Sequence, residues 1–205
     1  MTNYMTPTEE TYAGLEKAFD HFNEKLFEKR LPPVLFTLTR KGKAHGYFWP
    51  EQFKHRDGDT THEIALNPNT MDRNIEAVLA TLVHEMTHLE QQEYGTPSKG
   101  GHHNMEWVGM MQRVGLIASN TGEVGGAQTG RQMTHYIDEN GPFVQAFQEL
   151  MPFDLPYFTM PLEKAEKKKD LSKVKHQCGC GQKAWAKAGS RLVCGDCNEP
   201  MIGEV

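Results

Sequence analysis

The feature that most constrains this chain is a pair of histidines one helical turn apart, in the segment His84-Glu85-Met86-Thr87-His88. The surrounding residues predict a long helix, because apolar side chains recur there at helical spacing. These side chains are Ile75, Val78, Leu82, Met86 and Leu89, and the run ends at Gly95 and Pro97. Residues four apart on a helix are separated by about 40° around its axis, so His84 and His88 can bind one metal ion. Glu85 can hold a water molecule on that ion, which is the position of a general base.

A catalytic zinc ion usually has three protein ligands, and this motif supplies two. The longer pattern H-E-x-x-H-x-x-G-x-x-H is absent, because positions 91 and 94 are Gln and Tyr. The third ligand must therefore come from farther along, where His102, His103 and Glu106 are the candidates. We favour His103, because it lies at a predicted junction between a loop and a helix, where a side chain can point back across a groove. Spacing alone leaves His102 and Glu106 open.

The rest of the first 150 residues alternates helix-like and strand-like segments. An amphipathic helix is expected to begin at the capping sequence Thr6-Pro7-Thr8-Glu9 and to end before Pro32. Strand-like runs at residues 34–40, 45–49 and 62–66 predict a small, mostly antiparallel sheet. After the histidine motif we expect a helix over 104–114, a glycine-rich loop over 121–130, a strand over 134–137 and a helix over 142–150. This order is typical of an α+β domain with helices packed on a small sheet.

All four cysteines, Cys178, Cys180, Cys194 and Cys197, lie close together near the end of the chain. Such clustering in a chain without a secretion signal favours a metal site over disulfides. The second pair has the C-x-x-C spacing of a zinc knuckle, whereas the first pair is one residue shorter. We predict a structural zinc ion on the four thiolates. His176 is a substitute ligand if one cysteine cannot reach, and a metal-free tail is the remaining alternative.

Charge and composition suggest how the chain is divided. We expect a main domain over 1–151, a linker over 152–172 and a zinc ribbon over 173–205. Residues 1–150 carry 13 basic and 20 acidic side chains, whereas residues 151–205 carry 9 and 7. The basic end, with its lysine-rich linker, is therefore the better candidate for contact with DNA. No apolar run is long enough for a membrane span and no signal peptide is evident, so we expect a cytoplasmic protein without membrane contact.

Several motifs together resemble the SprT-like zinc metallopeptidases. They are Leu66-Asn67-Pro68, residues 81–88, residues 101–107, Thr121-Gly122-Glu123-Val124-Gly125-Gly126 and Thr129-Gly130. The resemblance extends from His21-Phe22-Asn23 through Gly46-Tyr47-Phe48 to the terminal cysteines, although the short first cysteine pair departs from the ribbon of that family. It implies a zincin-like fold, a catalytic zinc ion on His84, His88 and His103, and Glu85 as the group that activates water. Eukaryotic members cleave proteins crosslinked to DNA.

These observations lead to two hypotheses. The first is a zinc-dependent metalloendopeptidase that cleaves a protein or peptide substrate, with DNA-associated or DNA-crosslinked proteins as its targets. The second is a nucleic-acid-associated zinc-binding protein with little or no proteolytic turnover. His135 and Tyr136, on the expected strand over 134–137, are candidates for stabilising an oxyanion in the first case, although a half-buried strand explains them as well.

Overall fold

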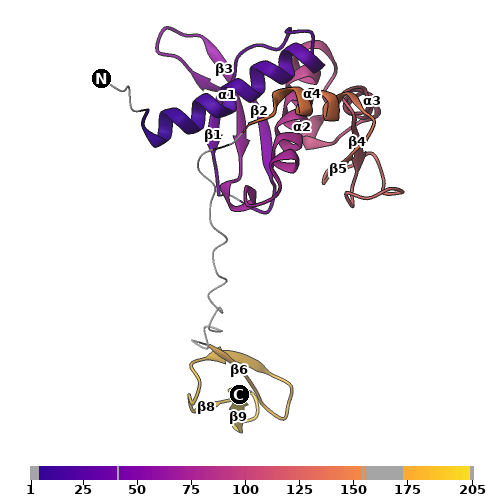
Figure 1. The fold of residues 1–205 in the computed structure, drawn as a ribbon. Helices are drawn as coiled ribbons and strands as arrows, with labels where there is room; N and C mark the ends of the chain where they lie inside the picture. Colours follow the sequence, from indigo (N-terminus) through magenta and orange to yellow (C-terminus); the bar gives the residue numbers. More distant parts are fainter. Residues whose placement is uncertain (1–4, 41, 154, 156–172, 204–205) are drawn as a thin grey trace. The chain divides into compact units, whose positions relative to one another are not determined.

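The computed structural model describes residues 5–40, 42–153, 155 and 173–203 (Figure 1). The chain divides into two compact units, Met1–Pro161 and Leu162–Val205, and each is described by itself. The first unit is a mixed α+β structure, as expected. Its elements are α1 (Pro7–Leu26), β1 (Leu35–Leu38), β2 (Gly46–Lys54), β3 (Thr60–Leu66), η1 (Pro68–Thr70), α2 (Ile75–Tyr94), η2 (Lys99–Gly101), α3 (Met105–Arg113), β4 (Leu116–Ser119), β5 (Thr134–Ile137) and α4 (Pro142–Leu150).

The three-stranded sheet of the first unit is mixed, which corrects the expectation of a mostly antiparallel sheet. Its strand order is β1-β3-β2, with β1 parallel to β3 and β2 antiparallel to β3. The β2–β3 hairpin folds so that β3 takes the centre, and β1 then adds to the free side of β3. β1 and β3 run in the same direction in the sheet, which makes this pair parallel. The second sheet, β4 with β5, is antiparallel, and the sequence had predicted β5 but not β4.

One hydrophobic core joins α1, α2, α3 and α4 to the inner face of the three-stranded sheet. Ile64 and Leu66 of β3, which share one face of the sheet, belong to this core, and Glu63 and Ala65 on the other face are buried as well. Phe19 of α1 packs edge-on against Phe36 of β1 at 5.9 Å between ring centroids. Phe153 and Leu155 are also buried in the core, so the packed unit reaches past the expected boundary at residue 151. Most of the expected linker over 152–172 lies outside the described residues.

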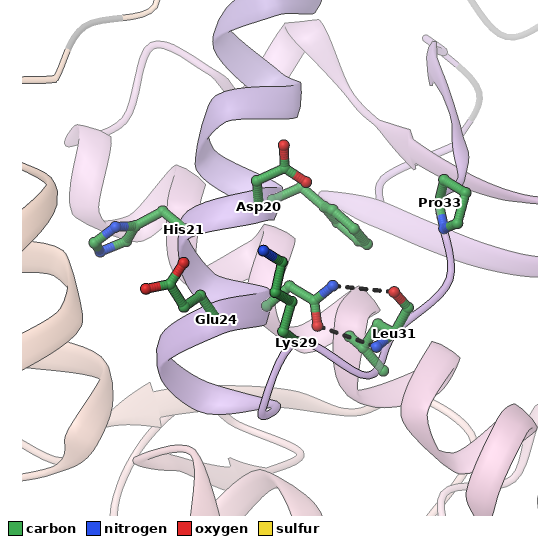
Figure 2. A pocket seen from close by; sticks show the side chains of 8 residues that line it. Asp20, His21, Glu24, Lys29, Leu31 and Pro33 are labelled. Carbon is green, nitrogen blue, oxygen red and sulfur yellow. Dashed lines mark hydrogen bonds between the residues drawn. The ribbon is translucent and has the colours of Figure 1, made fainter.

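The first helix begins as predicted, with Thr6 and Glu9 forming a capping box. The chain reverses direction after α1, and Asn23 in the last turn of the helix holds this reversal. Its side chain accepts a hydrogen bond from Leu31 N at 3.1 Å and donates one to Leu31 O at 3.0 Å. A pocket of about 380 Å³ lies beside this reversal, with Asp20, Glu24 and Lys29 at its wall (Figure 2). Its lining contains none of the candidate metal ligands, so it is separate from the histidine site.

The second unit contains a four-stranded sheet in the order β7-β6-β9-β8. Its strands are β6 (Val174–Gln177), β7 (Lys183–Ala186), β8 (Leu192–Val193) and β9 (Pro200–Gly203), and all pairs are antiparallel. We call residues 173–203 the ribbon. In the described parts of both units, no helix is both long and apolar enough to cross a membrane.

Candidate metal centre

Helix α2 carries His84, Glu85 and His88 through the middle of the core. Its N-cap is Asn74, whose side chain accepts a hydrogen bond from Glu76 N at 2.8 Å. The helix ends with Gly95 as its C-cap, as predicted. On the histidine face, His84 and Glu85 are buried and His88 is half-buried. The metal-binding face is therefore largely covered but still reaches solvent at His88.

Three histidines converge on one point. Ring nitrogens of His84, His88 and His103 all lie within 4.8 Å of one another, close enough to hold a single metal ion. His103 comes from the loop immediately before α3, and its ring centroid is 4.7 Å from that of His88. Of the three candidates for the third ligand, His103 is the one that the fold brings to the pair on α2.

The other two candidates lie elsewhere. His102 is exposed and is not part of the cluster. The Glu106 carboxylate accepts hydrogen bonds from Gln91 Nε2 and from Thr96 N, both at 2.7 Å. These bonds hold the pKa of Glu106 below its ordinary value. Glu106 thus ties the loop after α2 to α3.

The loop after α2 is also held by Asn104, the residue directly before α3. Asn104 accepts hydrogen bonds from Trp107 N at 3.0 Å, as the N-cap of α3, and from Gln91 Nε2 at 2.8 Å. It also donates a hydrogen bond from Nδ2 to Thr96 O at 3.0 Å. Because Asn104 directly follows His103, this network fixes the start of α3 and with it the position of His103.

Hydrogen bonds orient two of the imidazoles. His103 Nδ1 lies 2.9 Å from Gly130 O and donates to this carbonyl, which leaves His103 Nε2 for a metal ion. The backbones of His103 and Gly130 also pair as an isolated β-bridge. His84 Nδ1 lies 3.1 Å from His135 Nδ1. When His84 is the donor in this hydrogen bond, its Nε2 carries no proton and can bind the same ion.

His135 therefore contacts a candidate ligand, whereas the sequence suggested it as an oxyanion stabiliser. Tyr136 is half-buried and, because successive strand residues alternate, projects from the opposite face of β5. The structure brings His135, but not Tyr136, to the histidine cluster.

Trp107 forms the floor under the three rings. Its centroid lies 5.0 Å from His84, 5.0 Å from His88 and 4.4 Å from His103, and it stacks on His88 at an interplanar angle of 17°. The Trp107 side chain is fully buried, and its Nε1 has no hydrogen-bond partner among the described residues. Such packing restricts the rotamers of the imidazoles and pre-organises them.

Burial sets the protonation of the cluster. It lowers the pKa of His88 to about 3 and that of His135 to about 4, and it lowers the pKa of His84 well below its ordinary value. It lowers the pKa of His103 too, with a smaller opposing effect from the Gly130 carbonyl. The imidazoles are therefore neutral near pH 7, the form that binds metal ions. This donor set fits zinc.

Glu85 is buried beside the cluster, under the edge strand β2. Burial raises its pKa to about 8, against the lowering effect of a hydrogen bond from the Phe48 backbone. A Cβ atom at Gly46 would lie 3.2 Å from Glu85 Oε1 and 2.9 Å from Ala65 O, so glycine permits this close approach of strand and helix. The carboxylate thus lies between the motif helix and the sheet edge.

The ribbon holds the second candidate site. The Sγ atoms of all four cysteines lie within 4.8 Å of one another. The distances Cys178–Cys197 of 3.8 Å and Cys180–Cys194 of 3.5 Å are near the about 3.8 Å edge of a tetrahedron with zinc–sulfur bonds of about 2.3 Å. The Cys178–Cys180 pair is tighter, at 2.6 Å, in keeping with its shorter spacing.

The short first pair reaches the site through a glycine turn. Gly181 donates to Cys178 O at 2.9 Å and has φ of +94°, which glycine adopts without strain. His176, the substitute ligand, is not part of the cluster: it is buried, and its Nδ1 lies 3.1 Å from Val174 O. The four thiolates can therefore hold a metal ion without it.

Sequence reasoning did not identify the roles of Gly130, Trp107 and Asn104. Gly130 lies in the expected glycine-rich loop over 121–130, and Trp107 lies in the expected helix over 104–114. An Asn at the first position of the expected helix over 104–114 was a detectable signal for the N-cap. The contacts of Gly130 and Trp107 with the histidines depend on pairing across the fold, for which the local sequence holds no signal.

Comparison with known proteins agrees with this site. The SprT-like family matches residues 15–127, a stretch that includes His84, Glu85, His88 and His103. A protein of Salmonella typhimurium described as "Uncharacterized protein in mucB 3'region" is 49% identical over 59 residues, which are 28% of this chain and 80% of that protein. No solved structure matches the chain significantly. The family match covers more than half of the chain, and the chain therefore belongs to the SprT-like family.

Proposed function

We propose that this chain is a zinc-dependent metalloendopeptidase with a zincin-like catalytic domain. The observation that carries the proposal is the convergence of His84, His88 and His103 within 4.8 Å, with Glu85 on the same helix. The SprT-like family is associated with metallopeptidase-type function, which supports the same conclusion. His84, His88 and His103 would hold the zinc ion, which when bound polarises a water molecule and a peptide carbonyl.

The residues of the chain have separate tasks in this proposal. The Glu85 carboxylate accepts a proton from the attacking water and passes it to the leaving amine. The Phe48 N–H holds that carboxylate in place from the β2 edge. His135 and the Gly130 carbonyl keep the His84 and His103 rings oriented through their Nδ1 atoms. Trp107 excludes water from the floor of the site.

Glu85→Gln tests the general-base role. The amide keeps the shape of the side chain but cannot accept the proton, so we expect unchanged metal content and a loss of peptide cleavage of at least about 100-fold. Glu76→Gln, in the first turn of the same helix, is the matched control and should keep full activity. Full cleavage by the Glu85→Gln protein, with metal bound, would contradict the proposal.

The targets we propose are proteins associated with or crosslinked to DNA. The contrast in charge between the acidic first 150 residues and the basic remainder supports this, because the basic end can bring the enzyme to a polyanion. Cleavage of a DNA-bound protein should therefore exceed cleavage of the same protein without DNA. If Glu85-dependent cleavage is absent under both conditions while zinc is bound, the nucleic-acid-associated binding protein becomes the better description.

We propose that the ribbon site holds a second, structural zinc ion. Four thiolates complete a tetrahedron and leave no position for water, so this site would stabilise the ribbon rather than catalyse. Thiolates that serve as metal ligands must stay reduced, and this requirement supports the cytoplasm as the proposed location.

A further inference from the structure

Arg73 lies in the turn between η1 and α2, directly before the N-cap Asn74. Its Nε donates a hydrogen bond to Thr70 O at 2.7 Å, and its Nη2 donates one to Thr81 Oγ1 at 3.0 Å. A guanidinium has five N–H donors, and these bonds use two of them. The two bonds therefore fix the position of the guanidinium and leave donors for a further acceptor.

Arg73 has no counter-ion among the described residues. It is half-buried, and burial lowers its pKa, against a raising effect from the charge of the exposed Asp72. The ion pairs of the described residues do not include Arg73, whereas the more exposed Arg30 and Arg113 both pair with Glu90. A charge that loses water without gaining a partner costs free energy. An anion from outside the chain would supply the missing partner.

Thr81 connects this arginine to the metal site. It lies on α2 four residues before Glu85, about 6 Å along the helix axis. A Cβ atom on Gly46 would lie 3.2 Å from Thr81 Cγ2 and 3.2 Å from Glu85 Oε1, so both side chains flank the same point of β2. The guanidinium of Arg73 therefore lies about one helical turn from the proposed general base.

Two imidazoles lie near the same guanidinium. Partial loss of water contact lowers the pKa of His45, and the positive charge of Arg73 lowers it further. Burial lowers the pKa of His135, and the charges of Arg73 and His45 act in the same direction. No carboxylate contributes to either shift, and His135 Nδ1 lies 3.1 Å from His84 Nδ1. This side of the metal site is therefore electropositive, which favours an anion.

We propose that Arg73 binds a side-chain carboxylate of the substrate and gives the peptidase a preference for Asp or Glu near the scissile bond. The paired N–H groups of a guanidinium match the two oxygens of a carboxylate. Residues of an extended peptide are about 3.3 Å apart, so one helical turn from Glu85 corresponds to one or two residues from the scissile bond. The inference rests on the proposed function and adds the chemistry of the substrate.

The first test maps the cleavage sites that the full-length protein makes in heat-denatured serum albumin, by mass spectrometry. Wild type should cut where Asp or Glu lies at one particular position, one or two residues from the scissile bond. Arg73→Met retains an aliphatic chain without charge and should cut without this enrichment. Arg56→Met removes an exposed arginine from the turn between β2 and β3 and should cut as wild type does.

The second test uses amidated peptides built on the strongest cleavage site, with Glu or Gln at the enriched position. Wild type should favour the Glu peptide by about 10-fold in kcat/KM, the lower range for a hydrogen bond to a charged group. This ratio should fall to about 1 in Arg73→Met and to an intermediate value in Arg73→Lys, which keeps the charge but not the planar donors. An unchanged zinc content in each variant would show that the histidine site remains folded.

The two possible sources of a carboxylate are separated by the end of the peptide. An amidated peptide has no terminal carboxylate, so a preference seen there belongs to the Glu side chain. A Gln peptide with a free C-terminus tests the other source. If only this peptide shows a preference that depends on Arg73, the carboxylate comes from the chain end and the side-chain assignment is overturned.

Two further results would overturn the inference. One is the absence of any preference for Glu over Gln in the wild type. The other is an equal loss of cleavage of both peptides in Arg73→Met, which would leave the ratio unchanged and assign Arg73 to the fold or to the reaction itself.

A binding measurement separates this inference from the peptidase proposal, because it needs no cleavage. The Glu85→Gln protein with zinc bound is titrated with amidated decapeptides of alternating Ala and Glu or alternating Ala and Gln. The Glu peptide should bind more tightly, and Arg73→Met in the same protein should remove the difference. Equal binding alongside normal Glu85-dependent cleavage by wild type would count against this inference alone. Arg73-dependent binding without any cleavage by wild type would count against the peptidase alone.

Discussion

The two candidate metal sites of this chain are built in opposite ways. The histidine site lies on α2 and beside α3, inside a domain with an extensive apolar core. The cysteine site lies on turns of a small sheet, where the buried side chains among the described residues are His176, Cys178 and Cys194. We therefore expect the first site to be shaped by the apolar core around it. We expect the ribbon, which has few buried side chains among its described residues, to depend on a bound metal ion to fold.

Metal removal should separate the two units most clearly. Structural zinc sites in small domains contribute about 10–16 kcal/mol, which a ribbon of this size cannot replace by packing. After chelation, amides of β6, β7 and β9 should lose protection from hydrogen exchange, while those of α1 and α2 keep it. Cys194→Ser should reproduce the loss in the ribbon, and His88→Ala should not. If the ribbon amides stay protected from hydrogen exchange without metal, the ribbon does not need a metal ion to fold, and the two units do not differ in this respect.

The buried carboxyl of Glu85 affects the stability of the first unit alone. We expect its burial to destabilise the metal-free domain. Its pKa is raised from 4.5 to about 8, so the folded state keeps a proton that the unfolded state releases. Stability therefore falls as pH rises between these values. Glu85→Gln should stabilise the metal-free protein by a few kcal/mol at pH 8, and by little below pH about 4.5.

Thermal unfolding of the metal-free wild-type and Glu85→Gln proteins at pH 5 and pH 8 measures this effect. The buried histidines are present in both proteins and change the stability of both alike. Because their pKa values are lowered in the folded state, they destabilise it at low pH rather than at high pH. The difference between the two proteins isolates Glu85. A difference that does not grow with pH would show that the carboxyl is not buried as described.

His135→Ala tests orientation of the first site through a neighbour. Partners that orient a metal-binding histidine typically contribute 10- to 100-fold in metal affinity, that is about 1.4–2.7 kcal/mol. We expect a loss in this range at the histidine site and no change at the cysteine site, measured by competition with a chelator. His55→Ala, an exposed histidine on the first unit, is the control. Unchanged metal affinity would leave His135 free for the oxyanion role that its sequence suggested.

Glu106→Gln should have the smallest effect. Both hydrogen bonds to Glu106 end on its Oε2, so the amide oxygen of Gln can still accept both, but as weaker bonds to an uncharged acceptor. The loop after α2 should lose about 1 kcal/mol and metal content should stay at one ion per histidine site. His103→Ala should instead empty that site, and His102→Ala should not. Metal loss in the Glu106→Gln protein would assign the third ligand to Glu106.

Local patterns in the sequence determined much of this protein. Helical spacing of apolar residues predicted α2 around His84 and His88, the capping box predicted the start of α1, and the segments 134–137 and 142–150 match β5 and α4. The cysteine spacing predicted that four thiolates would gather. These features depend on neighbours within a few residues, and backbone geometry fixes their relative positions.

Tertiary structure alone decided which distant segments meet. It placed β3 between β1 and β2, brought His103 rather than Glu106 to the α2 histidines, and set Trp107 beneath all three rings. It also aligned Trp185, Val193 and Ile202 on one side of the ribbon. Such contacts arise from strand pairing and core packing over long separations in the chain, where local spacing no longer restricts which residues approach each other.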